Sequence, residues 1–283
     1  MKTVVITGGN SGIGYHACLQ LAKIGHKIVM ICRNESSAKQ NCAKIKMLTN
    51  NNNVLYHIAD LSDENSVKKI AEELVLKYET IDILINNAAD FDLSNKNAQF
   101  NVNGIEKQFA TNVIAPFILC EMLMPVIQKS KGKIINISTK GLMVYPNLTL
   151  NFENMNSEKN YKPDKTYYQN KLALLIFSML MKEKYKDVSF HAIRVTNVKI
   201  DIKRYPNIST FLKLMYKFKS LLSISPEDMA KTYVELSVND YDGFLYDENV
   251  KEVKANKSVY DKETQEKLYN ILMMYITKWA TSV

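Results

Sequence analysis

The stretch TGGNSGIG, residues 7–14, decides the fold class of this chain. It holds four of the chain's nine glycines, follows the apolar run VVI and precedes a helical pattern. Glycines clustered at such spacing indicate backbone with positive φ or a close approach that side chains would block. A strand, a glycine-rich turn and a helix start form an anion site, because unpaired N–H groups and the positive end of the helix dipole point at the turn. We therefore expect a nucleotide's phosphates there, while a plain strand-to-helix turn remains the alternative on this string alone.

The rest of the chain alternates between strand-like and helical patterns. Apolar runs predict strands at 4–7, 27–32, 53–58, 81–86, 133–138, 188–195 and 243–247. Helical patterns lie between them, near 13–24, 35–48, 63–78, 103–129, 165–186 and 226–238. Continuous apolar strands separated by helices predict an α/β fold, a doubly wound Rossmann-type parallel sheet of about seven strands with helices on both faces.

Length and composition favour one large domain. The chain has 283 residues, of which 46% are hydrophobic, so we expect a single domain over 1–283. The first strand starts within three residues of Met1, so we expect no signal peptide. No apolar run approaches the length of a bilayer span, so we expect no transmembrane segment and a cytoplasmic protein.

Cysteine, histidine and charge patterns exclude other classes. The four cysteines lie in apolar patterns without C-x-x-C spacing, which predicts free buried thiols in a reducing compartment. The four histidines are scattered without ligand spacing, so we expect no metal site. The net charge of +8 is spread along the chain without a compact basic stripe, which argues against a nucleic-acid partner.

In a doubly wound fold, ligands bind at the carboxyl ends of the strands. The first four strand ends carry small residues, where a ligand must come close to the backbone, and polar residues at the rim. The predicted contacts are Gly8, Asn10, Ser11, Gly12, Ile13 and Gly14 after the first strand, Arg33 and Asn34 after the second, Asp60 and Leu61 after the third, and Asn87, Ala88 and Ala89 after the fourth. Each end alone could be a plain turn, but the four together predict a dinucleotide crevice.

The residue after the second strand selects between two nicotinamide dinucleotides. An acidic side chain there would accept from a ribose 2′-OH, whereas Arg33 offers a cation to a 2′-phosphate. NADP(H) is therefore favoured over NAD(H). A surface arginine at a strand end is the ordinary alternative, and Arg33 becomes informative once the glycine turn is accepted as a phosphate site.

The helix that follows the fifth strand opens with KTYYQNKLALL, residues 165–175. Tyr167 and Lys171 are four residues apart and share one helix face, whereas Tyr168 points elsewhere. A phenol has a pKa of about 10, and an adjacent ammonium lowers it by stabilising the phenolate. Tyr167 then becomes a candidate general acid or base. An ordinary Tyr–Lys pair on an exposed face is the alternative for this spacing alone.

Several of these motifs, taken together in their order along the chain, resemble the pattern of one protein family. The ordered set TGGNSGIG, DL, NNAA, Asn112, Ser138 and Tyr167-x-x-x-Lys171 resembles the short-chain dehydrogenases/reductases over nearly the whole chain. The stretches NGIEKQFATNVIAPFIL, FENMNSEKNYKP, YYQNKLALLIFS, SPEDMAKTYVELS and DGFLYDENVKEV resemble the retinol dehydrogenase branch and its WW-domain oxidoreductase relatives.

The resemblance implies a role for each matching position. Tyr167 would exchange a proton with the substrate oxygen, and Ser138 would hydrogen-bond the same oxygen. Lys171 would lower the pKa of Tyr167 and hold the nicotinamide ribose, so Tyr167 and Lys171 also contact the cofactor. Asn112 would orient a water molecule in a proton relay. Hydride would pass between nicotinamide and carbonyl carbon, since the cofactor carries that chemistry.

Three positions depart from the family pattern. Ala89 replaces the glycine of N-N-A-G and tightens that wall, and Asn170 replaces a small Ser or Ala. The Pro-Gly turn after the sixth strand is replaced by Thr196-Asn197, which puts in doubt how the cofactor-binding turn Thr196, Asn197 and Val198 is shaped. Asn tolerates positive φ, so we expect Asn197 to take the place of the glycine.

Substrate identity rests on a segment near 199–225, where this fold normally places a lid. Its apolar residues recur at helical spacing, and we expect Phe211 and Met215 to line the pocket beside Ser138 and Tyr167. Helix packing and peripheral contact with a membrane surface are the alternatives. The resemblance implies a small-molecule substrate, a lipophilic aldehyde, ketone or alcohol such as a retinoid, a steroid or a secondary metabolite.

Two matters stay open at this level. A non-catalytic NADP(H)-binding redox sensor or interaction module could use the same fold, although the complete set Asn112, Ser138, Tyr167 and Lys171 favours an enzyme. The sequence does not decide between a monomer and a homodimer. The terminal stretch KLYNILMMYITKW either supplies an interface or caps the core.

Overall fold

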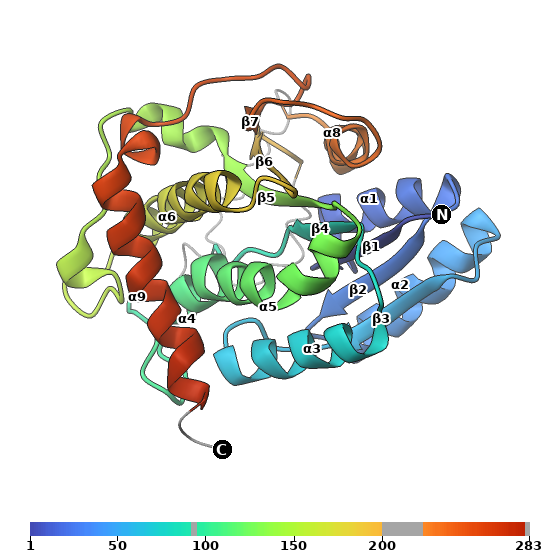
Figure 1. Ribbon diagram of the computed structural model, residues 1–283, viewed down its shortest axis with the longest axis horizontal. Coiled ribbons are helices and arrows are strands. Elements are labelled where there is room, and N and C mark those ends of the chain that lie inside the picture. Colours follow the sequence, from blue (N-terminus) through green and yellow to red (C-terminus); the bar gives the residue numbers. More distant parts are fainter. Residues whose placement is uncertain (92–94, 200–222, 281–283) are drawn as a thin grey trace, which may run out of the picture.

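The apolar runs form one parallel sheet of seven strands, in the order β3-β2-β1-β4-β5-β6-β7, which confirms the predicted fold class (Figure 1). The computed structural model describes residues 1–91, 95–199 and 223–280. The strands are β1 (Thr3–Thr7), β2 (Lys27–Cys32), β3 (Val54–Ile58), β4 (Ile83–Asn86), β5 (Lys133–Thr139), β6 (Ser189–Val195) and β7 (Leu245–Tyr246). The single-domain organisation stays a prediction.

Helices cover both faces of this sheet. They are α1 (Gly12–Lys23), α2 (Glu35–Thr49), α3 (Glu64–Lys77), α4 (Lys107–Phe109), α5 (Ala115–Lys129), α6 (Pro163–Lys184), α8 (Pro226–Val238) and α9 (Lys262–Ala280). Buried side chains of α1, α2 and α8 form one core layer, and those of α3, α5, α6 and α9 form the other. The two apolar layers explain why the strands read as continuous apolar runs.

The sheet order changes direction between β1 and β4, which both pair with their neighbours in parallel register. Chain connections leave in opposite directions on the two sides of this point, so a crevice opens at the carboxyl ends of the strands. The glycine turn follows β1 and the NNAA stretch follows β4. The fold therefore places these two motifs side by side.

The helix predicted from residue 103 begins instead at α4. Gly104 has φ 75° and interrupts the pattern, and the Glu106 carboxylate then accepts from the N–H groups of Gln108 and Phe109. The terminal stretch forms α9, which packs against α6 and buries Leu268 and Leu272 completely. In the structure, this stretch caps the core (Figure 1).

One segment corrects the expectation that no apolar run reaches the length of a membrane span. Within the described ranges, the helical segment Lys107–Lys129 is long and apolar enough by length and composition, with mean hydropathy 1.7. However, 78% of the 18-residue window that gives this hydropathy is buried inside the protein, between the sheet and its neighbouring helices. Burial of this kind is typical of the core helix of a globular fold.

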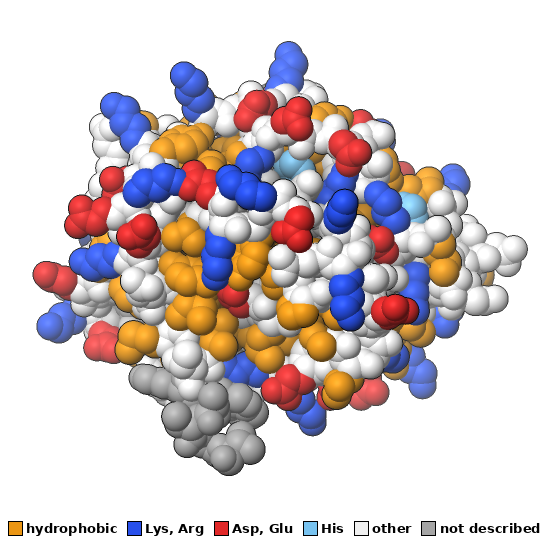
Figure 2. All heavy atoms as spheres, in the orientation of Figure 1, with side chains coloured by type: hydrophobic (Ala, Val, Ile, Leu, Met, Phe, Trp, Pro, Cys, Tyr) orange, Lys and Arg blue, Asp and Glu red, His pale blue; other side chains and the backbone are white. Residues whose placement is uncertain are grey.

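Charged groups are mixed over the visible surface. On the face shown in Figure 2, Lys and Arg side chains alternate with Asp and Glu and do not gather into one basic patch. The four cysteines are free and buried, as the sequence predicts. Burial raises the pKa of the Cys32 thiol to about 11, so this thiol stays protonated near neutral pH.

Candidate active site

A groove of about 540 Å³ lies at the carboxyl ends of β1 to β4. All the residues predicted at the first four strand ends line it. The remaining described lining residues are Ile31, Cys32, Ser62, Ala59, Asp90, Lys107 and Thr111. Lys107 and Thr111 are four residues apart on the segment that carries Asn112, and this spacing is a signal that sequence reasoning left unused.

The glycine turn has the backbone that its sequence predicts. Gly8 and Gly12 have φ of 66° and 56°, a region that side chains disfavour. A Cβ at Gly14 would lie 2.6 Å from the Gly8 carbonyl oxygen and 2.5 Å from Asn87 Nδ2. The turn is therefore folded tightly against the NNAA stretch and leaves its outer side open to the groove.

The N-terminus of α1 differs from those of three other helices. Asn34, Asp63 and Ser225 each accept a backbone N–H at the start of α2, α3 and α8. At the start of α1, Ser11 makes no side-chain cap and the first turn holds no acidic residue. The helix thus points open N–H groups and its positive dipole end into the groove, which suits a phosphate.

Thr7 and Tyr233, two residues outside the predicted site, help to hold the glycine turn in place. Asn87 Nδ2 donates to the Thr7 carbonyl at 2.9 Å, and the Ala88 N–H donates to Thr7 Oγ1 at 2.9 Å. The buried Tyr233 hydroxyl donates to Asn87 Oδ1 at 3.2 Å. Thr7 opens the quoted motif, so its position was a usable signal. Tyr233 lies on α8, far along the chain, and only the fold brings it here.

The rim of the groove beyond β2 is polar. Arg33 is exposed, and Asn34 uses its side chain to cap α2. Asn10 donates to Ser37 Oγ at 3.1 Å, which ties the glycine turn to α2. Asp60, at the end of β3, accepts from the Ser62 backbone and hydroxyl. Arg33 is thus a cation at the groove edge, as predicted.

Ser138 and Lys171 lie buried between β5 and α6, each with 2% of its surface exposed. Lys171 Nζ donates to the Ile137 carbonyl at 2.7 Å, which fixes it one residue from Ser138. Burial lowers the pKa of Lys171 to about 7. Ser138 Oγ has no hydrogen-bond partner among the described residues. A buried hydroxyl without a partner costs free energy that a bound oxygen atom would recover.

The two neighbouring tyrosines of α6 face different surroundings. Lys171 Nζ lies 5.8 Å from the centroid of the Tyr167 ring. The ring of Phe91 lies against Tyr167 with centroids 4.2 Å apart. Tyr168 instead packs against Tyr145 and Gly141. The structure brings Tyr167 to Lys171, as the spacing predicts, and adds Phe91, for which the sequence offered no signal.

Asn112 sits in a π-helical turn, Ala110–Ile114, between α4 and α5. Pro116 has no N–H, so the Asn112 carbonyl cannot accept the ordinary α-helical bond from residue 116. The Asn112 side chain exchanges two hydrogen bonds of 2.8 Å with the backbone of Asp90. Asp90 precedes Phe91, so Asn112 connects to the neighbourhood of Tyr167. Single π turns are common at functional sites.

The structure does not bring every predicted residue to the groove. Thr196, Asn197 and Val198 are not among its described lining residues. This loop is instead held by Ile224, whose N–H donates to the Asn197 carbonyl at 3.0 Å. Among the described residues with positive φ, Asn197 does not occur, so the expectation that it replaces a glycine is wrong. Phe211, Met215 and most of the segment near 199–225 lie outside the described residues.

Comparisons with known proteins agree with this architecture. A family model described as short chain dehydrogenase matches residues 2–150. Human polyprenol dehydrogenase is 27% identical over 281 residues, covering 95% of this chain and 83% of the relative. Mouse retinol dehydrogenase 13 is 27% identical over 279 residues, covering 95% and 81%. These relatives support the retinol dehydrogenase-like branch that the sequence predicts.

Solved structures share the fold. An uncharacterized protein from Mycobacterium paratuberculosis superposes with a TM-score of 0.69 at 22% identity, covering 96% of this chain and 93% of its own. A short chain dehydrogenase from Shigella flexneri, complexed with NADP, has a TM-score of 0.66 at 19% identity, covering 88% and 97%.

Proposed function

Because this chain belongs to the short-chain dehydrogenase family, we propose that it is an NADP(H)-dependent enzyme that interconverts a lipophilic alcohol and its aldehyde or ketone. Family membership makes it an oxidoreductase that acts on CH–OH and C=O groups with a nicotinamide cofactor. The cofactor preference, the substrate class and the role of each residue are the proposal.

The observation that carries the proposal is the buried cluster at the end of β5. Ser138 Oγ lacks a partner among the described residues, and Lys171 Nζ lies beside the Tyr167 ring. The Tyr167 hydroxyl gives its proton to the carbonyl oxygen during reduction, while Ser138 hydrogen-bonds that oxygen. Protonated Lys171 favours the phenolate that Tyr167 leaves behind. Asn112 orients a water molecule that returns the proton.

The groove fits a dinucleotide. The open N-terminus of α1 and the glycine turn suit the pyrophosphate, and the small side chains of Ala88 and Ala89 line the groove with them. The bound nicotinamide supplies the hydride in reduction and accepts it in oxidation. Lys171, whose Nζ donates to the Ile137 carbonyl, would hold its ribose.

Arg33 supports NADP(H) over NAD(H), because its exposed guanidinium stands at the groove edge where a 2′-phosphate would lie. Lys107 adds a second cation to the groove lining. A preference for apolar substrates is supported by the names of the relatives, a retinol and a polyprenol dehydrogenase. Phe211 and Met215 remain our proposed pocket residues from sequence. The cytoplasmic location also stays part of this proposal.

To test this, a panel of carbonyl compounds is offered to the purified protein with NADPH. Turnover is measured as the loss of NADPH absorbance. We expect long-chain aldehydes and bulky apolar ketones to give higher kcat/KM than small polar carbonyls such as glyceraldehyde. The same panel with NADH is the control. Tight NADPH binding without turnover of any compound would favour the redox-sensor alternative, and a preference for polar carbonyls would contradict the substrate class.

A further inference from the structure

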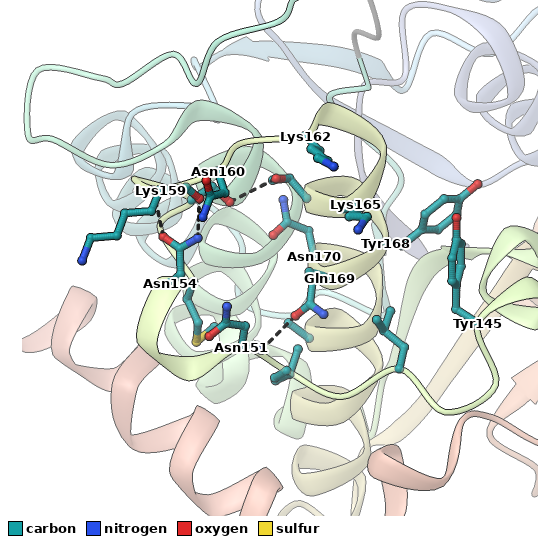
Figure 3. A pocket seen from close by; sticks show the side chains of 16 residues that line it. Tyr145, Asn151, Asn154, Lys159, Asn160, Lys162, Lys165, Tyr168, Gln169 and Asn170 are labelled. Carbon is teal, nitrogen blue, oxygen red and sulfur yellow. Dashed lines mark hydrogen bonds between the residues drawn. The ribbon is translucent and has the colours of Figure 1, made fainter.

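A second cavity of about 540 Å³ lies between residues 145–162 and the outer face of α6 (Figure 3). None of the described residues that line the groove at the strand ends contributes to it. Its lining comprises Tyr145, Leu148, Leu150, Asn151, Asn154, Met155, Ser157, Lys159, Asn160, Lys162, Lys165, Thr166, Tyr168, Gln169, Asn170 and Ala173. The proposed oxidoreductase chemistry uses none of these side chains.

Hydrogen bonds within the protein hold the walls of this cavity in place. Gln169 accepts from the Asn151 N–H at 3.1 Å and donates to the Thr149 carbonyl at 2.7 Å. Asn154 exchanges two bonds with the backbone of Lys159, at 2.7 and 3.1 Å. These side chains fix residues 149–159 as one wall and α6 as the other, as the dashed lines in Figure 3 show for Asn151 and Gln169.

Asn170 stands apart from these amides. Only 3% of its surface is exposed, and its Nδ2 atom has no hydrogen-bond partner among the described residues. A buried amide group without a partner is unfavourable, because it has lost its hydrogen bonds to water. In Figure 3 the Asn170 side chain projects from α6 toward the side where Asn154 and Asn160 lie. A ligand acceptor at this point would remove that cost.

The charges of the lining have one sign. Three lysines belong to it, Lys159, Lys162 and Lys165, and the described lining contains no Asp or Glu. Figure 3 shows the Lys159 ammonium pointing away from the other labelled groups. Lys162 precedes α6 and Lys165 lies in its first turn, where the helix dipole adds positive potential; Asp164 of the same turn lies outside the lining, so two cations stand against one carboxylate there. This end of the cavity therefore favours an anion.

The remaining wall is apolar. Leu148, Leu150, Met155 and Ala173 line it and join the hydrophobic core behind α6. Covering this surface with an aliphatic chain is favourable, because apolar area is removed from water. A small inorganic anion would leave it wet.

We propose that this cavity binds an aliphatic carboxylate, with its chain on Leu148, Leu150 and Met155 and its carboxylate near Lys162, Lys165 and Asn170. The site stands on geometry separate from the proposed catalytic function. It borders that function at Tyr168, whose ring lies 5.6 Å from the Tyr167 ring.

The test is calorimetric titration of the full chain with decanoate, and with acetate and 1-decanol as partial probes. We expect one equivalent of decanoate to bind, acetate not to bind detectably, and 1-decanol to bind at least tenfold more weakly. The double variant Lys162→Gln/Lys165→Gln and the variant Asn170→Leu should each weaken decanoate at least tenfold. Lys159→Gln, the matched control, should change it less than twofold.

Leu150→Trp narrows the cavity from its half-buried rim and should abolish binding even if Asn170→Leu fails to fold. Thermal unfolding of each variant separates a lost site from a lost fold. If decanoate binds the double lysine variant and Leu150→Trp as tightly as it binds the parent, it occupies another place, such as the substrate pocket. That outcome overturns the proposal. Absence of binding to the parent protein also overturns it.

Discussion

The groove at the strand ends and the buried cluster at the end of β5 differ in what forms their surfaces. In the groove, backbone N–H groups and the turn that contains Gly8 and Gly12 form the surface, and the charged side chain of Arg33 is exposed. In the cluster, side chains form the surface, and Ser138 and Lys171 are each 2% exposed. Under the proposed function, recognition of the dinucleotide would be spread over many weak contacts, whereas proton transfer would depend on a few buried atoms.

This difference sets the expected size of mutational effects. An exposed group in the groove shares its work with neighbours and with water, so its loss changes affinity moderately. A buried group in the cluster acts where water cannot replace it and where its own ionisation is already perturbed. We therefore expect effects to fall from Tyr167 through Lys171 and Arg33 to Phe91.

Tyr167→Phe removes one hydroxyl and should give the largest effect. General acid or base groups contribute about 10²–10⁴-fold to rate, so kcat should fall by that factor while affinity for NADPH changes little. Steady-state kinetics on the best carbonyl of the panel and fluorescence titration of NADPH measure the two quantities. Tyr168→Phe is the matched control, because Tyr168 faces Tyr145, and it should keep kcat within about threefold. Inactivity of the control alone would assign the chemistry to the wrong tyrosine.

Lys171→Met should separate activity from stability. Turnover should fall about 100-fold or more, since the phenolate loses its cation. Burial lowers the pKa of Lys171 to about 7 in the folded protein, whereas the unfolded chain holds this proton up to about pH 10.4. Between these values the unfolded state binds more protons, so the stability of the parent should rise with pH and should flatten below about 7.

Methionine carries no such charge, so the variant should be more stable than the parent at pH 6.5, with a difference that shrinks toward pH 10. The scale is set by about 1.4 kcal/mol per unit of pKa shift. Urea unfolding at pH 6.5, 8 and 9.5, without added nucleotide, gives the two curves. If the stabilities of parent and variant changed in parallel with pH, the pKa of Lys171 would be the same in the folded and the unfolded protein.

The sequence predicts the sheet and the groove because both follow local rules. Apolar runs define the strands, and parallel strands place their carboxyl ends at one edge, so Gly8, Arg33, Asp60 and Asn87 meet there without any knowledge of packing. The pair Tyr167 and Lys171 follows from helical spacing in the same way. Such inferences need only periodicity and topology.

Contacts between distant segments escape that reasoning. Tyr233 reaches Asn87 from α8, and Phe91 reaches Tyr167 from the loop after β4, because packing selects those partners. The expected positive φ at Asn197 rests on a single residue's conformational tolerance, yet the hydrogen bond from the Ile224 N–H to the Asn197 carbonyl holds this backbone in another conformation. Tertiary hydrogen bonds override a local preference of that size.

Arg33→Ala tests the groove. A hydrogen bond to a charged group is worth about 1.5–3 kcal/mol, and the exposure of Arg33 places the effect at the low end, so NADPH should bind about tenfold more weakly. Affinity for NADH should stay within about twofold, because NADH lacks the 2′-phosphate. Titration of both nucleotides against parent and variant gives the ratio. Equal losses for the two nucleotides would mean that Arg33 supports the fold of the groove and does not read the 2′-phosphate.

Phe91→Leu should give the smallest effect and shows where the groove meets the cluster. The Phe91 ring lies 4.2 Å from that of Tyr167 with an interplanar angle of 35°, and leucine keeps the apolar bulk while losing the ring contact. Aromatic pairs contribute about 0.5–1.5 kcal/mol beyond burial, so kcat should fall about 2- to 10-fold as the Tyr167 hydroxyl becomes less well held, with KM for NADPH unchanged. Phe152→Leu, at a ring that packs under Lys267 of α9, is the control and should leave kcat unchanged. A change confined to the KM of the carbonyl substrate would make Phe91 a wall of the substrate pocket and would leave Tyr167 positioned by Lys171 and the helix alone.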